Sequence, residues 1–162
     1  MGYSVSISLQ DVRILAKNVP GAIEALSQLM REEVGEAFDR SPEETWDEVC
    51  PRECFDWVRT EPLHRALKEG DIIQALKEWR YEAETLWVSD LEKLATLSEY
   101  EDVFIKCFNS DRWGDDDRLW RALAPYIESG AIIEMRVEEQ HYWRYVFQGG
   151  KLIEQQGHIE WV

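Results

Sequence analysis

The sequence predicts a single α+β domain in which an antiparallel sheet packs on helices. Three β-prone runs follow one another near the C-terminal end, at 131–138, 142–148 and 151–161, with short polar or glycine turns between them. The N-terminal residues alternate apolar and polar, as a half-buried strand does, and the intervening residues show helical periodicity. Because no Ser/Gly-rich linker divides the 162 residues, one domain spanning 1–162 is expected.

The N-terminal part is predicted to hold a strand followed by a helix. Large side chains alternate with serines along the strand, at Tyr3, Val5, Ile7 and Leu9. Residues 19–34 are predicted to be helical because apolar side chains recur there every three or four positions. Asn18 is expected to cap this helix, and Pro20 to lie in its first turn.

The middle of the chain is predicted to contain two short helices and two strands. Thr60 and Asp71 are residue types that cap helices, and apolar stripes follow both. The runs 81–88 and 102–108 are rich in β-branched and aromatic residues, which favours strands.

A further helix is predicted just before the C-terminal strands. Asp115 or Asp116 is expected to cap it, and Gly130 to end it. Its apolar stripe consists of Leu119, Trp120, Leu123, Ala124 and Ile127. The helices are expected to cover one face of the sheet and to leave the other face in contact with solvent.

The charge of the chain restricts its partners. With 18 basic and 33 acidic side chains, the formal net charge is −15. A protein with this negative charge repels phosphate backbones and anionic lipid head groups, so direct binding to nucleic acid is not expected. The longest apolar runs are too short to cross a bilayer, and the first residues lack the pattern of a secretory signal, which predicts a cytoplasmic protein.

The acidic side chains concentrate in the segment 32–61. It holds eleven acids and three arginines, so that 3 − 11 gives −8. Its central part, 35–60, is predicted to be loop with short helices. Two interpretations compete: a solvated face that maintains solubility, or a docking surface for a basic protein partner. The candidate partner-binding residues in this segment are Glu43, Glu44, Asp47 and Glu48.

The open face of the sheet offers a second candidate surface. Alternation along 142–148 assigns Trp143, Tyr145 and Phe147 to the core, and Tyr142 and Arg144 to the open face. A regular meander would add the charged residues Glu134, Arg136, Glu138, Glu154, His158 and Glu160 to that face. They form either a lattice of cross-strand ion pairs, each worth less than about 1 kcal/mol, or a recognition surface anchored by Tyr142 and Arg144.

A metal-dependent reaction is the enzymatic alternative. A divalent-metal hydrolase would use the acidic and imidazole side chains of Asp111, Asp115, Asp116, Glu134 and His141. Acidic residues before a helix also offset its macrodipole, and this explanation is favoured. No metal or other cofactor is therefore predicted. The sequence also lacks a phosphate-binding loop and a nucleophile elbow.

The C-terminal third resembles a group of known proteins. The residues that carry the resemblance are 119–130, Ile133, Glu134, Met135, 143–147 and 149–151. Over 115–161 the chain is similar to the C-terminal part of small uncharacterised bacterial and phage-associated proteins. The resemblance implies a helix followed by a strand pair, and it implies no activity or functional residue.

Three functions remain open from the sequence. The first is an acidic cytoplasmic binding protein without enzymatic activity, immunity-like or inhibitor-like, that docks a basic protein partner. The second is the metal-dependent hydrolase. The third is a structural subunit of a homo-oligomer, since eight tryptophans exceed what a small core needs.

Overall fold

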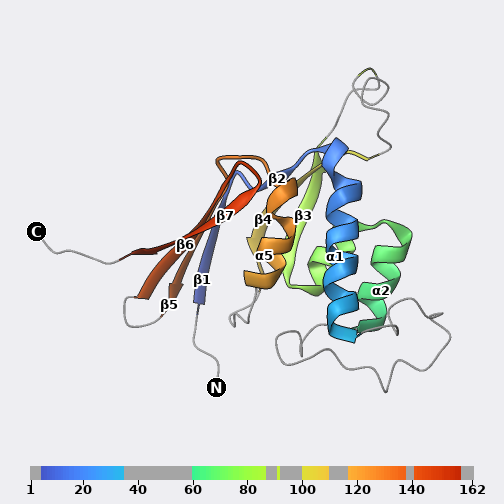
Figure 1. Ribbon diagram of the computed structural model, residues 1–162, viewed down its shortest axis with the longest axis horizontal. Coiled ribbons are helices and arrows are strands. Elements are labelled where there is room, and N and C mark those ends of the chain that lie inside the picture. Colours follow the sequence, from blue (N-terminus) through green and yellow to red (C-terminus); the bar gives the residue numbers. More distant parts are fainter. Residues whose placement is uncertain are drawn as a thin grey trace, which may run out of the picture.

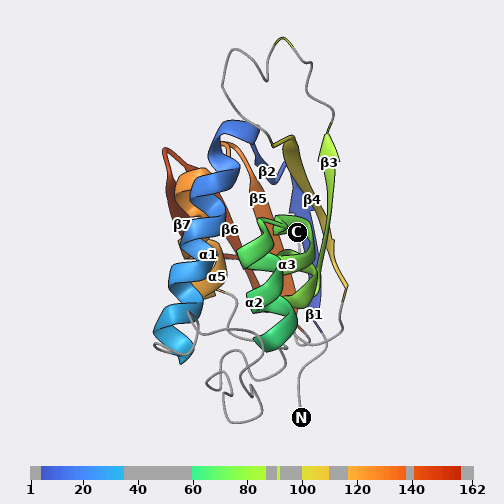
Figure 2. The same ribbon diagram turned by 90° about the vertical axis from the view of Figure 1, so that its right-hand side faces the viewer.

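The computed structural model describes residues 5–34, 60–86, 91, 100–109, 117–137 and 141–157. These residues form two antiparallel sheets and a set of helices, which confirms the predicted α+β class. Figures 1 and 2 show helices α1 (Val19–Val34), α2 (Thr60–Glu69) and α5 (Asp117–Leu123) on the same side of the four-stranded sheet. Within the described ranges, no helix combines the length and the apolar character needed to cross a bilayer.

The four-stranded sheet contains the predicted C-terminal meander. Its strand order is β1-β5-β6-β7, with bounds Val5–Gln10, Ile132–Val137, His141–Gln148 and Lys151–Gly157. Strand β1 pairs with β5 and so extends the meander on the side away from β7. Gly149 and Gly150 form the turn between β6 and β7, and both have positive φ (60° and 78°), as a two-residue hairpin turn requires.

The three-stranded sheet is made from the N-terminal segment and the middle of the chain. Its order is β2-β4-β3, with bounds Arg13–Ile14, Asp102–Phe108 and Tyr81–Leu86. The chain passes from β1 to β2 through Asp11, which has a φ of 54° and turns the backbone. The carbonyl oxygen of Val12 then accepts the backbone N–H of Ile105 at 2.9 Å. One short N-terminal segment therefore belongs to both sheets.

The helices agree with the predicted positions, with two corrections at their ends. Their bounds are α1 Val19–Val34, α2 Thr60–Glu69, α3 Ile72–Glu78 and α5 Asp117–Leu123. The side chain of Asp71 caps α3 by accepting the N–H of Gln74 at 3.0 Å, as expected. Asn18, in contrast, belongs to a 3-10 turn, Ala16–Asn18, that runs directly into α1. The helical conformation thus begins before the predicted cap.

The expected end of α5 at Gly130 is wrong. The helix ends at Leu123 and is followed by a 3-10 turn, Ala124–Tyr126. The cause is Pro125, which lacks an N–H and disfavours the helical conformation of the residue before it. The chain then becomes extended at Ile127, which forms a β-bridge with Ile14. The predicted apolar stripe of this region is nevertheless buried throughout.

Trp120 of α5 joins the two sheets in the core. Its ring is fully buried and makes edge contacts with Tyr81 of β3 and Phe147 of β6, at centroid distances of 4.9 and 6.1 Å. The indole N–H donates a hydrogen bond to the Tyr81 hydroxyl at 3.2 Å. The polar atom of this large side chain therefore has a buried partner, which avoids the cost of an unsatisfied donor.

A close contact between α1 and the 3-10 turn requires glycine at position 21. A Cβ atom placed on Gly21 would overlap the Tyr126 ring, at 2.9 Å from its Cδ1. The change Gly21→Ala normally stabilises a helix by about 1 kcal/mol. Here we expect a net loss of about 1–3 kcal/mol of unfolding free energy, because the half-buried ring must move. Urea denaturation measures this, and a more stable Gly21→Ala variant would contradict the contact.

Candidate functional site

The register of the four-stranded sheet separates its residues into an inner and an outer face. On the inner face, Ile133, Met135, Tyr145 and Phe147 are buried in the core under the helices. The outer face carries polar side chains arranged in two neighbouring rows across the strands. One row is Ser6, Arg136, Tyr142 and Gly157, and the next is Ser8, Glu134, Arg144 and Gln155.

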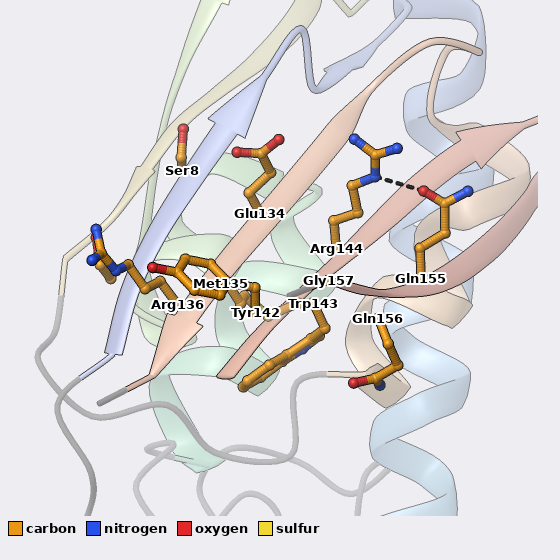
Figure 3. Close-up of a pocket in the computed structure, with 11 residues that line it drawn as sticks. Ser8, Glu134, Met135, Arg136, Tyr142, Trp143, Arg144, Gln155, Gln156 and Gly157 are labelled. Carbon is orange, nitrogen blue, oxygen red and sulfur yellow. Dashed lines mark hydrogen bonds between the residues drawn. The ribbon is translucent and has the colours of Figure 1, made fainter. Parts of the chain in front are cut away.

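These two rows, together with Met135, Trp143 and Gln156, line a groove of about 840 Å³, here called the outer groove. Figure 3 shows its side chains projecting from β1, β5, β6 and β7. Gly157 gives Tyr142 room in the first row, since a Cβ atom at Gly157 would lie only 3.2 Å from that of Tyr142. An aromatic side chain opposite a glycine also covers strand backbone that the glycine leaves bare.

The two arginines of the outer groove interact with neutral groups. The Cζ atom of Arg136 lies 5.2 Å from the centre of the Tyr142 ring, within the range of a cation–π interaction. The Nε–H of Arg144 donates a hydrogen bond to Oε1 of Gln155 at 2.5 Å (Figure 3). Both arginines are exposed, and each has one of these contacts within the sheet to restrict its side chain.

Among the described residues, no ion pair involves Arg136, Arg144 or Glu134. Glu134 lies directly opposite Arg144 in the register of β5 and β6, yet the two do not form a salt bridge. The predicted lattice of cross-strand ion pairs is thus wrong for this part of the face. The other charged residues expected there, Glu138, His158 and Glu160, lie outside the described residues.

The expected place of Glu154 on the open face is also wrong. Glu154 pairs with Tyr145, an inner-face residue, and its Oε2 lies 3.6 Å from Nη2 of Arg121 in α5. The reason is the two-residue turn, which pairs Gln148 with Lys151. Outward positions are therefore even-numbered on β6 but odd-numbered on β7.

Burial of Tyr145 makes the stability of the protein sensitive to high pH. Loss of solvent, reinforced by the charges of Glu154 and Asp117, raises the pKa of Tyr145 well above its ordinary value. Above about pH 10 the unfolded chain releases this proton while the folded chain keeps it, so the free energy of unfolding falls as pH rises. The variant Tyr145→Phe is expected to weaken that fall between about pH 9 and 11. Urea denaturation across this range measures it, and parallel pH profiles for both proteins would refute it.

The remaining predicted site residues are only partly described. The candidate partner-binding acids Glu43, Glu44, Asp47 and Glu48, and the metal candidates Asp111, Asp115 and Asp116, lie outside the described residues. Of the other metal candidates, Glu134 faces the outer groove, whereas the register places His141 opposite Val137. In the described ranges, no three His, Cys, Asp or Glu side chains gather in a way that would hold a metal ion.

Cys107 of β4 is a partly buried thiol in contact with Glu82. It donates a hydrogen bond to Oε2 of Glu82 at 3.4 Å. Burial, and then this contact with Glu82, raise the pKa of the Cys107 thiol, which lowers the fraction of nucleophilic thiolate.

Sequence reasoning identified Tyr142 and Arg144 but missed four polar residues that line the groove. Ser6, Ser8, Gln155 and Gln156 are not among the predicted site residues. The sequence could have placed the serines on the open face, because they alternate with the apolar residues of the first strand. Their place beside Arg136 and Glu134 follows only once β1 is known to pair with β5.

Comparison with known proteins yields no relative for this chain. No protein family, no curated protein sequence and no solved structure matches it. The similarity of 115–161 to small bacterial and phage-associated proteins stays a prediction.

Proposed function

We propose that this protein is a binding protein whose outer groove docks a protein partner. The observation that carries the proposal is the pair of arginines, Arg136 and Arg144, that face the groove without a carboxylate partner among the described residues. Arginine and tyrosine are among the residue types that most often anchor protein interfaces. The outer groove combines them on one concave surface.

The arginines are also preorganised for binding. Holding a long flexible side chain in an interface costs about 0.5–1.5 kcal/mol of conformational entropy. The Tyr142 ring and the Gln155 amide already restrict Arg136 and Arg144 in the free protein. Less ordering is then left to occur when a partner binds, so this arrangement favours recognition over solubility alone.

The proposal includes a partner that is basic as a whole, and an immunity-like or inhibitor-like role. Its support is the net charge of −15, whose long-range field accelerates association with a cationic body. Association with such a partner should slow as salt screens the field.

A peptide selection tests whether the outer groove docks protein chains. A random peptide library displayed on phage is selected against the protein and counter-selected against a variant with Tyr142→Ala and Arg144→Ala. We expect peptides that bind the protein but not this variant. If selection enriches no peptide that distinguishes the two, the docking proposal is refuted.

A matched control separates the groove from the general surface. Arg80 is exposed and precedes β3 in the other sheet. The variant Arg80→Gln should retain the enriched peptides. Loss of these peptides by Arg80→Gln as well would show that binding does not depend on the groove.

A further inference from the structure

We propose that the segment docked in the outer groove is a stretch of the partner that carries at least two carboxylates. This inference rests on the proposed docking function and specifies its ligand. Among the described residues that line the groove, the charged ones are Arg136, Arg144 and Glu134, so that 2 − 1 gives a charge of +1. The chain as a whole carries −15. The described lining of the groove therefore has the opposite sign to the chain as a whole.

The placement of the two arginines requires a ligand with more than one carboxylate. Arg136 lies on β5 and Arg144 on β6, in neighbouring outward rows, so the two are offset both along the strands and across them. Figure 3 shows their guanidinium groups pointing away from each other, with Glu134 between them. A segment with carboxylates on two of its side chains is therefore needed to contact both guanidinium groups.

Both arginines retain donors for a carboxylate. Arg144 contacts Gln155 through Nε, which leaves its two terminal nitrogens for another acceptor (Figure 3). Arg136 interacts with the face of the Tyr142 ring, an interaction that does not use its N–H groups as donors to an oxygen. Guanidinium groups bind carboxylates through paired N–H donors, which gives both affinity and orientation.

The negative charge of Glu134 repels such a ligand. It therefore provides a test of whether the ligand is acidic or basic. It lies in the same row as Arg144, directly across from it. A ligand carboxylate bound to Arg144 would be repelled by Glu134, whereas a ligand ammonium group would be attracted by it. Removing the charge of Glu134 must therefore change the affinities of acidic and basic ligands in opposite directions.

An acidic segment is compatible with a partner that is basic overall. At about 0.15 M salt the Debye length is about 8 Å, so contacts inside the groove depend on nearby groups. The long-range field of the whole chain acts earlier, during diffusional encounter. The two charge requirements apply to different parts of the partner.

The experiment uses two short fluorescein-labelled peptides, one alternating Glu with Ser and the other alternating Lys with Ser. Fluorescence anisotropy at about 0.15 M salt measures their binding to the full chain. We expect the Glu-Ser peptide to bind more tightly. Arg136→Gln and Arg144→Gln should each weaken it about 5–10-fold, and Glu134→Gln should tighten it about 3–5-fold. Arg80→Gln should change it less than about 2-fold.

Opposite results overturn the inference. Tighter binding of the Lys-Ser peptide, weaker binding of the Glu-Ser peptide to Glu134→Gln, or no binding of either peptide would each refute the acidic ligand. The phage selection distinguishes this failure from failure of the docking function. If groove-dependent peptides are enriched but are neutral or basic, docking stands and only the acidic segment is refuted.

Discussion

Replacing Trp120 with alanine is expected to lower the free energy of unfolding by about 3–5 kcal/mol. The side chain is fully buried and touches both sheets, through Tyr81 and Phe147. Its removal would leave a cavity at the junction of α5 with β3 and β6, and would leave the Tyr81 hydroxyl without the indole N–H. Urea denaturation followed by far-ultraviolet circular dichroism measures the loss without relying on tryptophan fluorescence.

Trp120→Phe is the matched control for this prediction. It keeps an aromatic ring in the site but loses the indole N–H that bonds to Tyr81. We expect it to be less destabilising than Trp120→Ala, because the cavity is smaller. A loss below about 1.5 kcal/mol for Trp120→Ala would show that Trp120 does not hold the sheets together.

Reversing both groove arginines, Arg136→Glu with Arg144→Glu, is expected to weaken groove-selected acidic peptides at least about 100-fold. The reason is that like charges brought together in an interface cost several kcal/mol. The free energy of unfolding should also fall, by about 1 kcal/mol, because Arg144→Glu places a second carboxylate directly opposite Glu134 in the register of β5 and β6. Anisotropy titrations and urea denaturation of the same samples measure the two quantities.

A second double variant controls for net charge. Lys77→Glu with Arg80→Glu changes the charge by the same amount, from −15 to −15 − 4 = −19, at exposed positions outside the groove. It should weaken the acidic peptides only through the general field, by less than about 3-fold at about 0.15 M salt. Equal losses in the two double variants would mean that contacts with Arg136 and Arg144 do not bind the peptide.

Local patterns in the sequence predicted most of the individual elements. The helix over 19–34 has the bounds of α1, and the runs 131–138 and 142–148 match β5 and β6 within one residue. These patterns are local, because periodicity and turn residues act over a few positions. The pairing of β1 with β5, and the division of the strands into two sheets, depend on contacts distant in sequence and left no local signal.

The candidate site was predictable only in part, for a similar reason. Alternation placed Tyr142 and Arg144 on the outer face, where the structure has them. The choice of partners, Arg136 on the Tyr142 ring and Arg144 on Gln155, depends on register and side-chain geometry. Sequence reasoning therefore assigned these two residues of β6 to the correct face, but it misplaced Glu154 of β7 and left open whether the charges of the face cancel.

The pairing of β1 with β5 has a consequence for how the protein is made. Val5 pairs with Val137, so 137 − 5 = 132 residues separate the two. During synthesis on the ribosome, β1 emerges long before the strand that completes its hydrogen bonds. Such distant pairing slows folding. Strand β1 is thus expected to need protection from aggregation until β5 has emerged from the ribosome.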